Sequence, residues 1–298
     1  MIDNSHIGVI MPVKNEEDSV SDSIDTIIEQ THEPIELVIV NDGSTDATPE
    51  IIAGKANTSD NITIVELPEG EWDLGIHYAK VCISGFNKLL DHKPELDYIG
   101  LVDADILLPK NYFEKIIKEF TTNSSLGIAG GPIKMPNRKG EWVTDHTPRE
   151  FVHGANRIWR RQCFDETGGY IPTYCPDSVS NAKARIRGWQ LEIIPDLECV
   201  QVRETSTGNG LWNGYANIGR AKHFLNANKL YVLLKGVQYL MKAPHYPGIA
   251  YFLAYANDVI RRVDKIPDEE IRNYYRKDRP YQLIRKFVEK YDPRQRIS

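Results

Sequence analysis

Residues 98–109 of the sequence read YIGLVDADILLP. A short, nearly all-apolar run, 98–102, is followed at once by two carboxylates, Asp103 and Asp105. Such a run is typical of a strand buried inside a parallel sheet, and open sheets of this kind bind their ligands beyond the carboxyl ends of the strands. We therefore expect a strand over 98–102 that delivers both aspartates to the binding edge of a sheet. Pro109 is predicted to open the next helix.

The residues before this stretch repeat the same rhythm. Further apolar runs predict strands at 7–11, 35–40 and 62–67. Between them, Val20, Ile24, Ile27 and Ile28 recur with helical spacing, and further helices are predicted over 47–56 and 74–90. Alternation of strands and helices favours an α/β fold with helices on both faces of the sheet. From Gly127 the pattern changes to short strands and loops, and beyond about 209 it becomes helical again.

Composition restricts the classes of protein. The 298 residues include 36 Lys and Arg against 42 Asp and Glu, a net charge of −6, which argues against a general nucleic-acid binder. The four cysteines form no C-x-x-C pair, so neither a zinc knuckle nor a disulfide framework is indicated. No secretory leader and no spanning helix is recognisable, and a cytoplasmic protein, at most peripheral at the inner face of the cell membrane, is expected.

Polar clusters follow the predicted strands at 12–16, 41–44 and 103–105. Any one cluster could be turn or cap chemistry, whereas three at successive strand ends favour a ligand site. Asp103 and Asp105 are two residues apart, so they share a face in extended backbone and repel each other. A divalent cation with a preference for oxygen, Mg²⁺ or Mn²⁺, removes that cost. A helix cap with a neighbouring solvated acid is the alternative.

A fourth acid, Asp177, precedes a helical pattern. Val179, Ala182 and Ile186 recur at i, i+3 and i+7, and the pattern stops at Gly188. The spacing places Asp177 at or just outside a helix N-terminus. Its role is either that of a plain helix cap or that of a reactive carboxylate.

Several stretches together resemble family 2 glycosyltransferases with the GT-A nucleotide-sugar fold. They are VIMPVKNEE at 9–17, ELVIVNDGSTDAT at 36–48, YIGLVDADILLP at 98–109, GANRIWRRQCFDETGGY at 154–170 and PDSVSNAKARIRGWQLEIIPD at 176–196. The resemblance covers roughly residues 6–205. It implies a mixed sheet flanked by helices. The implied domains are a catalytic domain at 1–208, divided into a nucleotide-binding half (1–126) and an acceptor half (127–208), and a C-terminal helical extension at 209–298.

The resemblance also assigns roles to matching residues. The residues implied to hold the base and ribose are Pro12, Val13, Asn15, Glu16 and Asp42. Asp103 is implied to touch the ribose or a metal-bound water, and Asp105 to ligate the Mg²⁺ or Mn²⁺ that bridges the diphosphate. In many relatives the catalytic base is the Asp of a Glu-Asp pair. Position 176 is Pro here, which leaves Asp177 as the matching base.

The chain departs from the family pattern at three places. Lys80 stands where an Arg near the nucleotide is common, and Lys183 stands where the catalytic helix often has Arg. After Pro195-Asp196 the chain has Val200-Gln201-Val202-Arg203 where many relatives carry a metal-ligating His. Without that His, either metal binding is weaker than in those relatives or Arg203 stabilises the diphosphate directly.

The implied activity is metal-dependent transfer of a sugar from a nucleotide diphosphate sugar, most simply a UDP-sugar, to an acceptor hydroxyl with inversion. Glycans, polysaccharides and lipid-linked glycans are the acceptor classes. One rival function is that of a polyprenyl-phosphate sugar synthase. A second, motivated by Pro176 and the missing His, is a catalytically silent nucleotide-binding scaffold.

The remaining candidates are aromatic residues and the C-terminal helices. Either stacking on sugar rings or ordinary packing is possible for the tryptophans Trp72, Trp142, Trp159 and Trp189. His153 either contacts the acceptor or is an ordinary loop residue. Helices over about 212–263 are expected either to cover the acceptor side or to dock on a membrane, and not to span it. Their apolar faces, followed by Arg261, Arg262 and Lys265, suit core packing, a homodimer or peripheral membrane contact.

Overall fold

The computed structural model describes residues 5–68, 76–136, 140–144, 151–202, 210–241 and 243–282. Contacts divide the chain into two compact units, residues 1–205 and 206–298. The predicted boundary at 208/209 lies outside the described residues.

The first unit alternates strands and helices as its apolar runs predict. Its strands are β1 (Ile7–Val13), β2 (Glu36–Asp42), β3 (Ile62–Leu67), β4 (Tyr98–Val102), β5 (Ile106–Leu107), β6 (Leu126–Gly130), β7 (Ile133–Pro136), β8 (Trp142–Thr144), β9 (Asn156–Arg160), β10 (Gln190–Ile193) and β11 (Cys199–Gln201). Its helices are α1 (Val20–Ile28), α2 (Thr48–Ala56), α3 (Ile76–His92), α4 (Tyr112–Thr122), α5 (Arg161–Glu166) and α6 (Pro176–Ile186).

The main sheet has seven strands in the order β10-β6-β9-β4-β1-β2-β3. Strands β4, β1, β2 and β3 run parallel, whereas β9 lies antiparallel between β4 and β6. A smaller sheet has the order β5-β11-β7-β8. This is the expected mixed sheet. Because β4, β1 and β2 are neighbours, the polar residues that follow these three strands lie at one edge.

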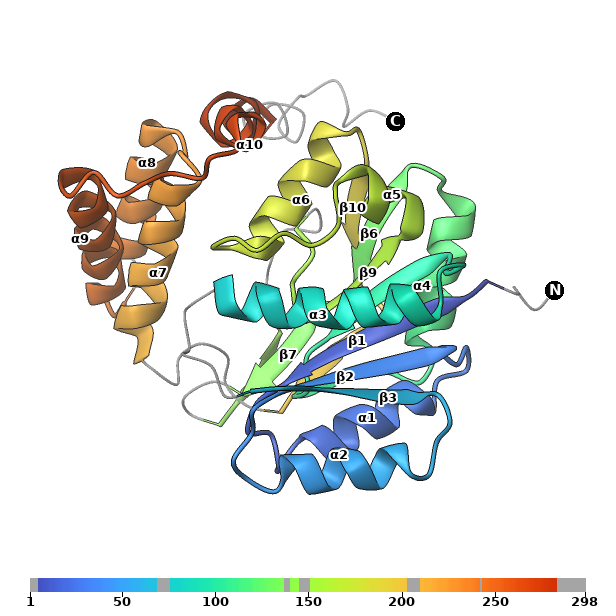
Figure 1. Ribbon diagram of the computed structural model, residues 1–298. Coiled ribbons are helices and arrows are strands. Elements are labelled where there is room, and N and C mark those ends of the chain that lie inside the picture. The colour runs from blue at the N-terminus through green and yellow to red at the C-terminus, as the bar shows by residue number, and fades with distance from the viewer. Residues whose placement is uncertain are drawn as a thin grey trace. The chain divides into compact units, whose positions relative to one another are not determined.

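Both faces of the sheet are covered by helices (Figure 1). Side chains of β1 alternate between two cores, because successive residues of a strand point to opposite faces. Val9 and Met11 pack in the core that includes α1 and α4, whereas Ile10 packs in the core that includes α3. All seven residues of β1 are buried. The continuous apolar run at 7–13 is explained by this burial on two sides.

The start of α4 differs from the prediction. The helix begins at Tyr112, with Asn111 at its N-cap position, and not at Pro109. The carbonyl of Pro109 accepts the Tyr112 N–H at 3.0 Å and the Gln30 side-chain amide at 2.9 Å, so residues 109–111 form a turn before the helix. The sequence pattern also missed β5, which exists through its pairing with the distant β11.

The second unit is helical. Its elements are α7 (Gly210–Phe224), α8 (Lys229–Leu240), α9 (Tyr246–Ile260), α10 (Glu269–Asn273) and a π-helical turn (Tyr274–Asp278). Asn228 caps α8 by accepting the backbone N–H groups of Leu230 and Tyr231. Helix α9 packs on α7 through small residues, with Gly219 so close to the backbone of Tyr251 that a side chain would not fit.

Candidate active site

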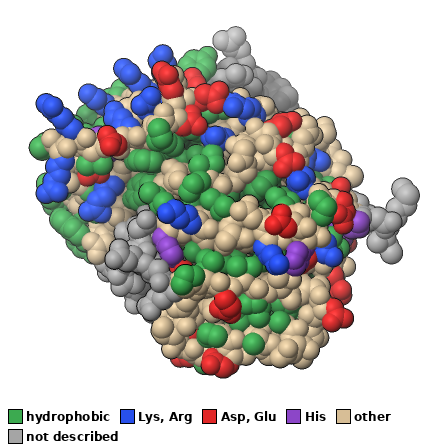
Figure 2. Space-filling model, in the orientation of Figure 1, with side chains coloured by type: hydrophobic (Ala, Val, Ile, Leu, Met, Phe, Trp, Pro, Cys, Tyr) green, Lys and Arg blue, Asp and Glu red, His purple; other side chains and the backbone are tan. Residues whose placement is uncertain are grey.

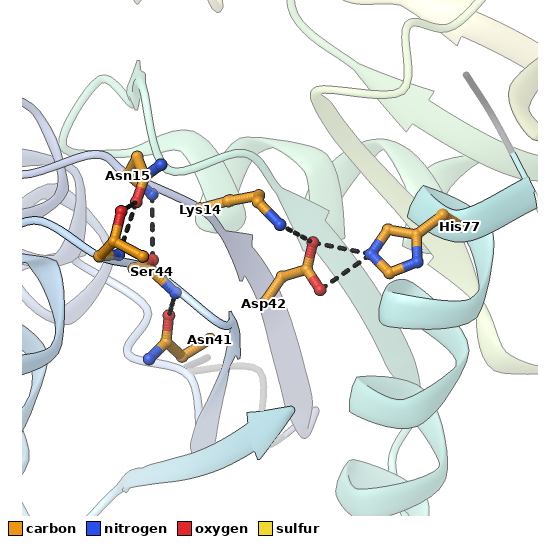
Figure 3. Close-up of polar contacts among 7 residues, drawn as sticks. Lys14, Asn15, Asn41, Asp42, Ser44 and His77 are labelled. Atoms are coloured by element: carbon orange, nitrogen blue, oxygen red, sulfur yellow. Dashed lines mark hydrogen bonds and ion pairs between the residues drawn. The ribbon is translucent and has the colours of Figure 1, made fainter. Parts of the chain in front are cut away.

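The ends of β1 and β2 are joined by an ion pair. Val13 pairs with Asn41 in the parallel register, which places the next residues, Lys14 and Asp42, side by side. Lys14 Nζ lies 3.3 Å from Asp42 Oδ2 (Figure 3). The Asp42 side chain is only 4% exposed. A buried carboxylate needs such partners, because desolvation of an unpaired charge is costly.

Hydrogen bonds also tie together the loops that follow these strands. Asn15 has a positive φ of 54°, a conformation that Asn tolerates better than most residues. Its backbone N–H donates to Ser44 Oγ at 3.0 Å (Figure 3). Its side-chain oxygen accepts the Thr45 N–H at 2.8 Å. The Glu16 N–H donates to Thr48 Oγ1 at 2.8 Å. The loops are thus fixed relative to each other.

The structure therefore brings together the residues implied to hold the base and ribose. Pro12 and Val13 end β1 and are buried, Asp42 ends β2, and Asn15 lies in the loop after β1. Glu16 is 9% exposed, and its carboxylate accepts the Ser19 hydroxyl at 2.8 Å.

Two residues from the first turn of α3 complete this edge, and the sequence analysis missed both. His77 Nε2 lies 2.8 Å from each Asp42 carboxylate oxygen (Figure 3). The Tyr78 hydroxyl donates to Asp103 Oδ1 at 2.7 Å. Lys80, the predicted nucleotide contact on the same helix, has an exposed side chain. The sequence signal that could have identified them is that two adjacent aromatic residues with polar atoms, His77 and Tyr78, stand at the start of a predicted helix.

Asp103 and Asp105 lie as predicted just beyond β4. Burial, and then the charge of Asp105, raise the pKa of Asp103 to about 7. Burial also raises the pKa of Asp105, which is 6% exposed. Burial keeps the pKa of Tyr78 well above its ordinary value, so its hydroxyl stays protonated and donates to Asp103 at neutral pH.

Gln201 is a further neighbour of this pair. Its Nε2 donates to Asp105 Oδ2 at 2.9 Å, and its side chain is buried. The antiparallel pairing of Gln201 with Ile106 brings β11 to this position. Gln201 belongs to the segment in which many relatives carry a His, so the departure from the family pattern lies directly beside the candidate metal ligand. Arg203, the other residue considered there, lies outside the described residues.

The carboxylate pair fits a hard divalent cation. Asp103 and Asp105 supply oxygen donors. Burial is the largest cause of the raised pKa of each, and a cation bound between them would offset the cost of a buried negative charge. No group of three or more His, Cys, Asp or Glu side chains suited to a metal occurs within the described ranges. A site formed by Asp103 and Asp105 alone leaves coordination positions for water and phosphate, as Mg²⁺ and Mn²⁺ sites at nucleotides commonly do.

Asp177 is the second residue of α6, inside the first turn and not at the cap position. Cys175 holds the cap position with a φ of 58°. The Tyr170 hydroxyl donates to Asp177 Oδ1 at 2.9 Å, and the carboxylate packs against Gly154, where a Cβ would collide with it. The Asp177 side chain remains 35% exposed. An acid fixed by a hydrogen bond yet open to solvent suits proton transfer.

Arg157 is a positively charged neighbour of this acid. The arginine side chain is fully buried, and its Nη2 lies 3.7 Å from Asp177 Oδ1. The guanidinium also donates to the carbonyls of Val152 and His153. Its positive charge opposes the larger effects that raise the pKa of Asp103, and the charge of Asp177 adds to them. Asp103, Asp177 and Arg157 therefore lie within electrostatic reach of one another.

The candidate tryptophans lie in different environments. Trp159 is buried in the core, and its indole donates to Ser180 Oγ at 3.2 Å, so it is not a sugar platform. The indole of Trp189 donates to Glu166 at 2.9 Å, whereas Trp142 is 52% exposed on β8. Trp72 lies outside the described residues. His153 precedes the glycine that contacts Asp177.

Replacing Asp103 with Asn should stabilise the metal-free protein at alkaline pH. The folded-state pKa of about 7 lies above the ordinary value of 3.8, so the unfolded chain releases this proton first and the free energy of unfolding falls as pH rises from about 4 to 7; above 7 it stays at the lower value. In EDTA at pH 8.5 we expect Asp103→Asn to raise the free energy of unfolding by about 1–3 kcal/mol. Near pH 4 the difference should vanish.

Denaturant unfolding at both pH values measures this effect. Asp60→Asn, which removes an exposed carboxylate, is the matched control and should change little at either pH. A gain from Asp103→Asn that is equal at pH 4 and pH 8.5 would show that ionisation of Asp103 is not its cause.

Comparison with known families identifies the class of protein. Residues 8–180 match the family described as Glycosyl transferase family 2, which is more than half of the chain. The chain belongs to this family.

The curated relatives are similar over part of their length. Glycosyltransferase GlyA of Streptococcus pneumoniae is 33% identical over 119 residues, which cover 40% of this chain and 16% of that protein. The 4,4'-diaponeurosporenoate glycosyltransferase of Staphylococcus aureus is 27% identical over 125 residues, 41% of this chain and 30% of that one. The matched region thus spans less than a third of either relative.

Solved structures share the fold over nearly the whole chain. The mannosyltransferase PcManGT from Pyrobaculum calidifontis, solved with GDP-Man and Mn²⁺, has a TM-score of 0.57 at 19% identity, covering 97% of this chain and 88% of that one. GalNAc-T7, solved with UDP, GalNAc and Mn²⁺, has a TM-score of 0.60 at 11% identity, covering 98% and 59%. These similarities establish the GT-A fold expected from the sequence.

Proposed function

We propose that the chain is a metal-dependent, inverting glycosyltransferase that moves a sugar from a nucleotide diphosphate sugar to an acceptor hydroxyl. One observation carries the proposal. The backbone N–H of Asp103 donates to the carbonyl of Ala155 at 2.9 Å, and the adjoining Gly154 lies against the carboxylate of Asp177, so one short segment holds the candidate metal-binding pair and the candidate base close together. Asp103 and Asp105, which are suited to hold a diphosphate through a metal ion, therefore belong to the same site as Asp177, which is suited to accept a proton.

The nucleoside end of the donor is assigned to the edge beyond β1 and β2. Asp42 is held by Lys14 and His77, so its carboxylate is fixed in place. A carboxylate has about four lone-pair sites, and a base or ribose hydroxyl can use those that remain. The fixed loop around Asn15 supplies a preformed surface for this half of the ligand.

The diphosphate is assigned to Asp103 and Asp105. A bound Mg²⁺ or Mn²⁺ would supply charge neutralisation for the leaving diphosphate. Gln201 orients Asp105 through its amide, and Tyr78 orients Asp103 through its hydroxyl. Both neighbours limit the rotation of the carboxylates.

Asp177 is assigned the role of general base. The acceptor oxygen attacks the anomeric carbon and forms the new C–O bond as the bond to the diphosphate breaks. The bonding electrons leave with the diphosphate, and the hydroxyl proton passes to Asp177. Tyr170 donates to Oδ1 of this carboxylate and so limits its rotation. A single displacement of this kind inverts the anomeric carbon without a covalent enzyme intermediate.

The experiment is a screen of UDP-, GDP-, ADP- and dTDP-sugars for release of the nucleoside diphosphate. We expect at least one donor to be turned over in Mn²⁺ or Mg²⁺ and turnover to stop in EDTA. Release that is equally fast in EDTA would contradict metal dependence. Tight binding of a nucleotide sugar with no turnover, with or without simple glycan acceptors, would favour the catalytically silent scaffold instead.

A lipid-linked acceptor is a second candidate for the acceptor side. The observation that favours it is the run of exposed leucines on α8. A lipid-linked acceptor would leave the assignments of the donor site and of the base unchanged.

A further inference from the structure

The helices of the second unit bury only part of their apolar surface within the unit. Helix α9 packs on α7 and on α8. Its buried positions include Ala250, Tyr251 and Ala254, and the contact with α8 is close enough that a Cβ on Gly236 would collide with the Phe252 ring. These contacts use one side of α8, which leaves its opposite side free of the helix packing just described.

The opposite side of α8 and the end of the helix form an exposed apolar stripe, here called the α8 apolar face. Its residues, with their exposed fractions, are Leu230 (63%), Leu233 (52%), Leu234 (61%), Val237 (42%) and Met241 (78%). The spacing i, i+3, i+4, i+7 and i+11 places all five on one side of a helix. Ile249 (46%) and Leu253 (57%) extend an apolar stripe along the neighbouring α9. Exposed apolar patches of this kind mark interaction surfaces.

Charge is distributed very unevenly between the two units. Residues 206–298 contain 17 Lys and Arg and eight Asp and Glu, a net charge of +9. Residues 1–205 contain 19 Lys and Arg and 34 Asp and Glu, a net charge of −15. From Gly210 to Ile260 the one acidic residue in the sequence is Asp258, which is buried. Figure 2 shows Lys and Arg side chains gathered over this unit, at the upper left of the view.

The combination of charge and apolar surface selects the kind of partner. Nucleic acid matches the positive charge but offers little to five exposed aliphatic side chains. A second copy of this unit matches the aliphatic side chains but brings +9 against +9. An anionic lipid surface satisfies both, because acyl chains receive the aliphatic side chains and headgroups attract Lys and Arg.

The geometry of the helices indicates how such contact would be made. Among the described helices, none has the length and hydropathy to cross a bilayer. A helix with an apolar face and flanking cations lies parallel to the surface, with that face at the headgroup boundary. Lys229 lies at the start of α8, and Arg261 and Arg262 follow the end of α9, all exposed.

We propose that the α8 apolar face docks the chain on anionic membrane surfaces, with α8 parallel to the bilayer and the neighbouring Lys and Arg side chains at the headgroups. The docking does not depend on the proposed transferase activity. If both hold, docking places the chain at a surface where lipid-linked acceptors reside.

Sedimentation with liposomes tests the proposal on the full chain. We expect binding to vesicles of 70% phosphatidylcholine and 30% phosphatidylglycerol, at least about tenfold weaker binding to pure phosphatidylcholine, and release in high salt or carbonate. Leu234→Glu should weaken binding at least about tenfold, and Lys229→Gln roughly fivefold. Val143→Glu is the matched control, because it adds the same charge at an exposed aliphatic position (43%) of the first unit.

The outcomes separate the proposal from its rivals. Circular dichroism and nucleotide affinity of Leu234→Glu should match those of the wild type, which shows that folding and the donor site are intact. Equal binding of Leu234→Glu and Val143→Glu, or no binding to anionic vesicles at low salt, would overturn the proposal. Resistance to carbonate would also overturn it, because only an integral segment survives that treatment. A change of oligomeric state in Leu234→Glu, seen by ultracentrifugation without vesicle binding, would assign the face to a second copy.

Discussion

Asp177→Asn should lower kcat by about 10²–10⁴-fold and leave the affinity for the donor nucleotide within about twofold of the wild type. Asn has nearly the same shape as Asp, and its side-chain oxygen can still accept the Tyr170 hydroxyl that now donates to Asp177 at 2.9 Å. The amide cannot accept a proton from the acceptor. The loss therefore falls on the chemical step and spares donor binding.

Steady-state kinetics with the donor found by the screen, together with calorimetry of its nucleoside diphosphate, measure the two effects. Asp196→Asn, at an exposed position after β10, is the matched control and should retain kcat. Retention of most of the wild-type kcat in Asp177→Asn would mean that another group is the base. A parallel loss of nucleotide affinity would mean that Asp177 acts mainly on the structure of the site.

Most of the sheet could be predicted from the sequence because its strands are buried on both faces. A run such as 7–13 carries its signal in its own residues, and β3 and β4 have the predicted bounds. Elements that depend on distant pairing gave no such signal. Strand β5 has two residues and exists through its ladder with β11, almost a hundred residues away.

The candidate site likewise contains residues that the local sequence predicts and residues that only the tertiary structure reveals. The residues at strand ends, such as Asp42, Asp103 and Asp105, follow from the local pattern and the order of the strands. His77 and Gln201 reach the same carboxylates from α3 and β11, and only the tertiary arrangement brings them there. Sequence position alone can also mislead. Trp159 is two residues from Arg157 in the sequence, yet its side chain is buried in the core.

Donor binding should require a divalent cation, and this is the largest effect we expect on affinity. Two unit charges 4 Å apart interact by about 4 kcal/mol at an effective dielectric constant near 20. A diphosphate brought to Asp103 and Asp105 meets repulsion of this order unless a cation lies between them. Allowing for partial protonation of Asp103, we expect at least about 100-fold weaker binding without metal, which corresponds to about 2.7 kcal/mol.

Asp105→Asn is the variant that isolates this effect. Its side-chain oxygen can still accept the Gln201 amide, so the local hydrogen bond at 2.9 Å is preserved while one negative charge is removed. We expect the variant to lose most of the gain that Mn²⁺ gives to nucleotide binding. Asp60→Asn, an exposed acid between α2 and β3, should keep the full gain.

Calorimetric titration of UDP, GDP and ADP into the wild-type protein, in Mn²⁺ and in EDTA, tests most directly whether the carboxylates beyond β4 hold a nucleoside diphosphate through a metal ion. The predicted result is that at least one nucleotide binds at least about 100-fold more tightly in Mn²⁺ and that Asp105→Asn removes most of this difference. Equal affinity in Mn²⁺ and in EDTA, or no binding of any nucleotide in either, would contradict the account.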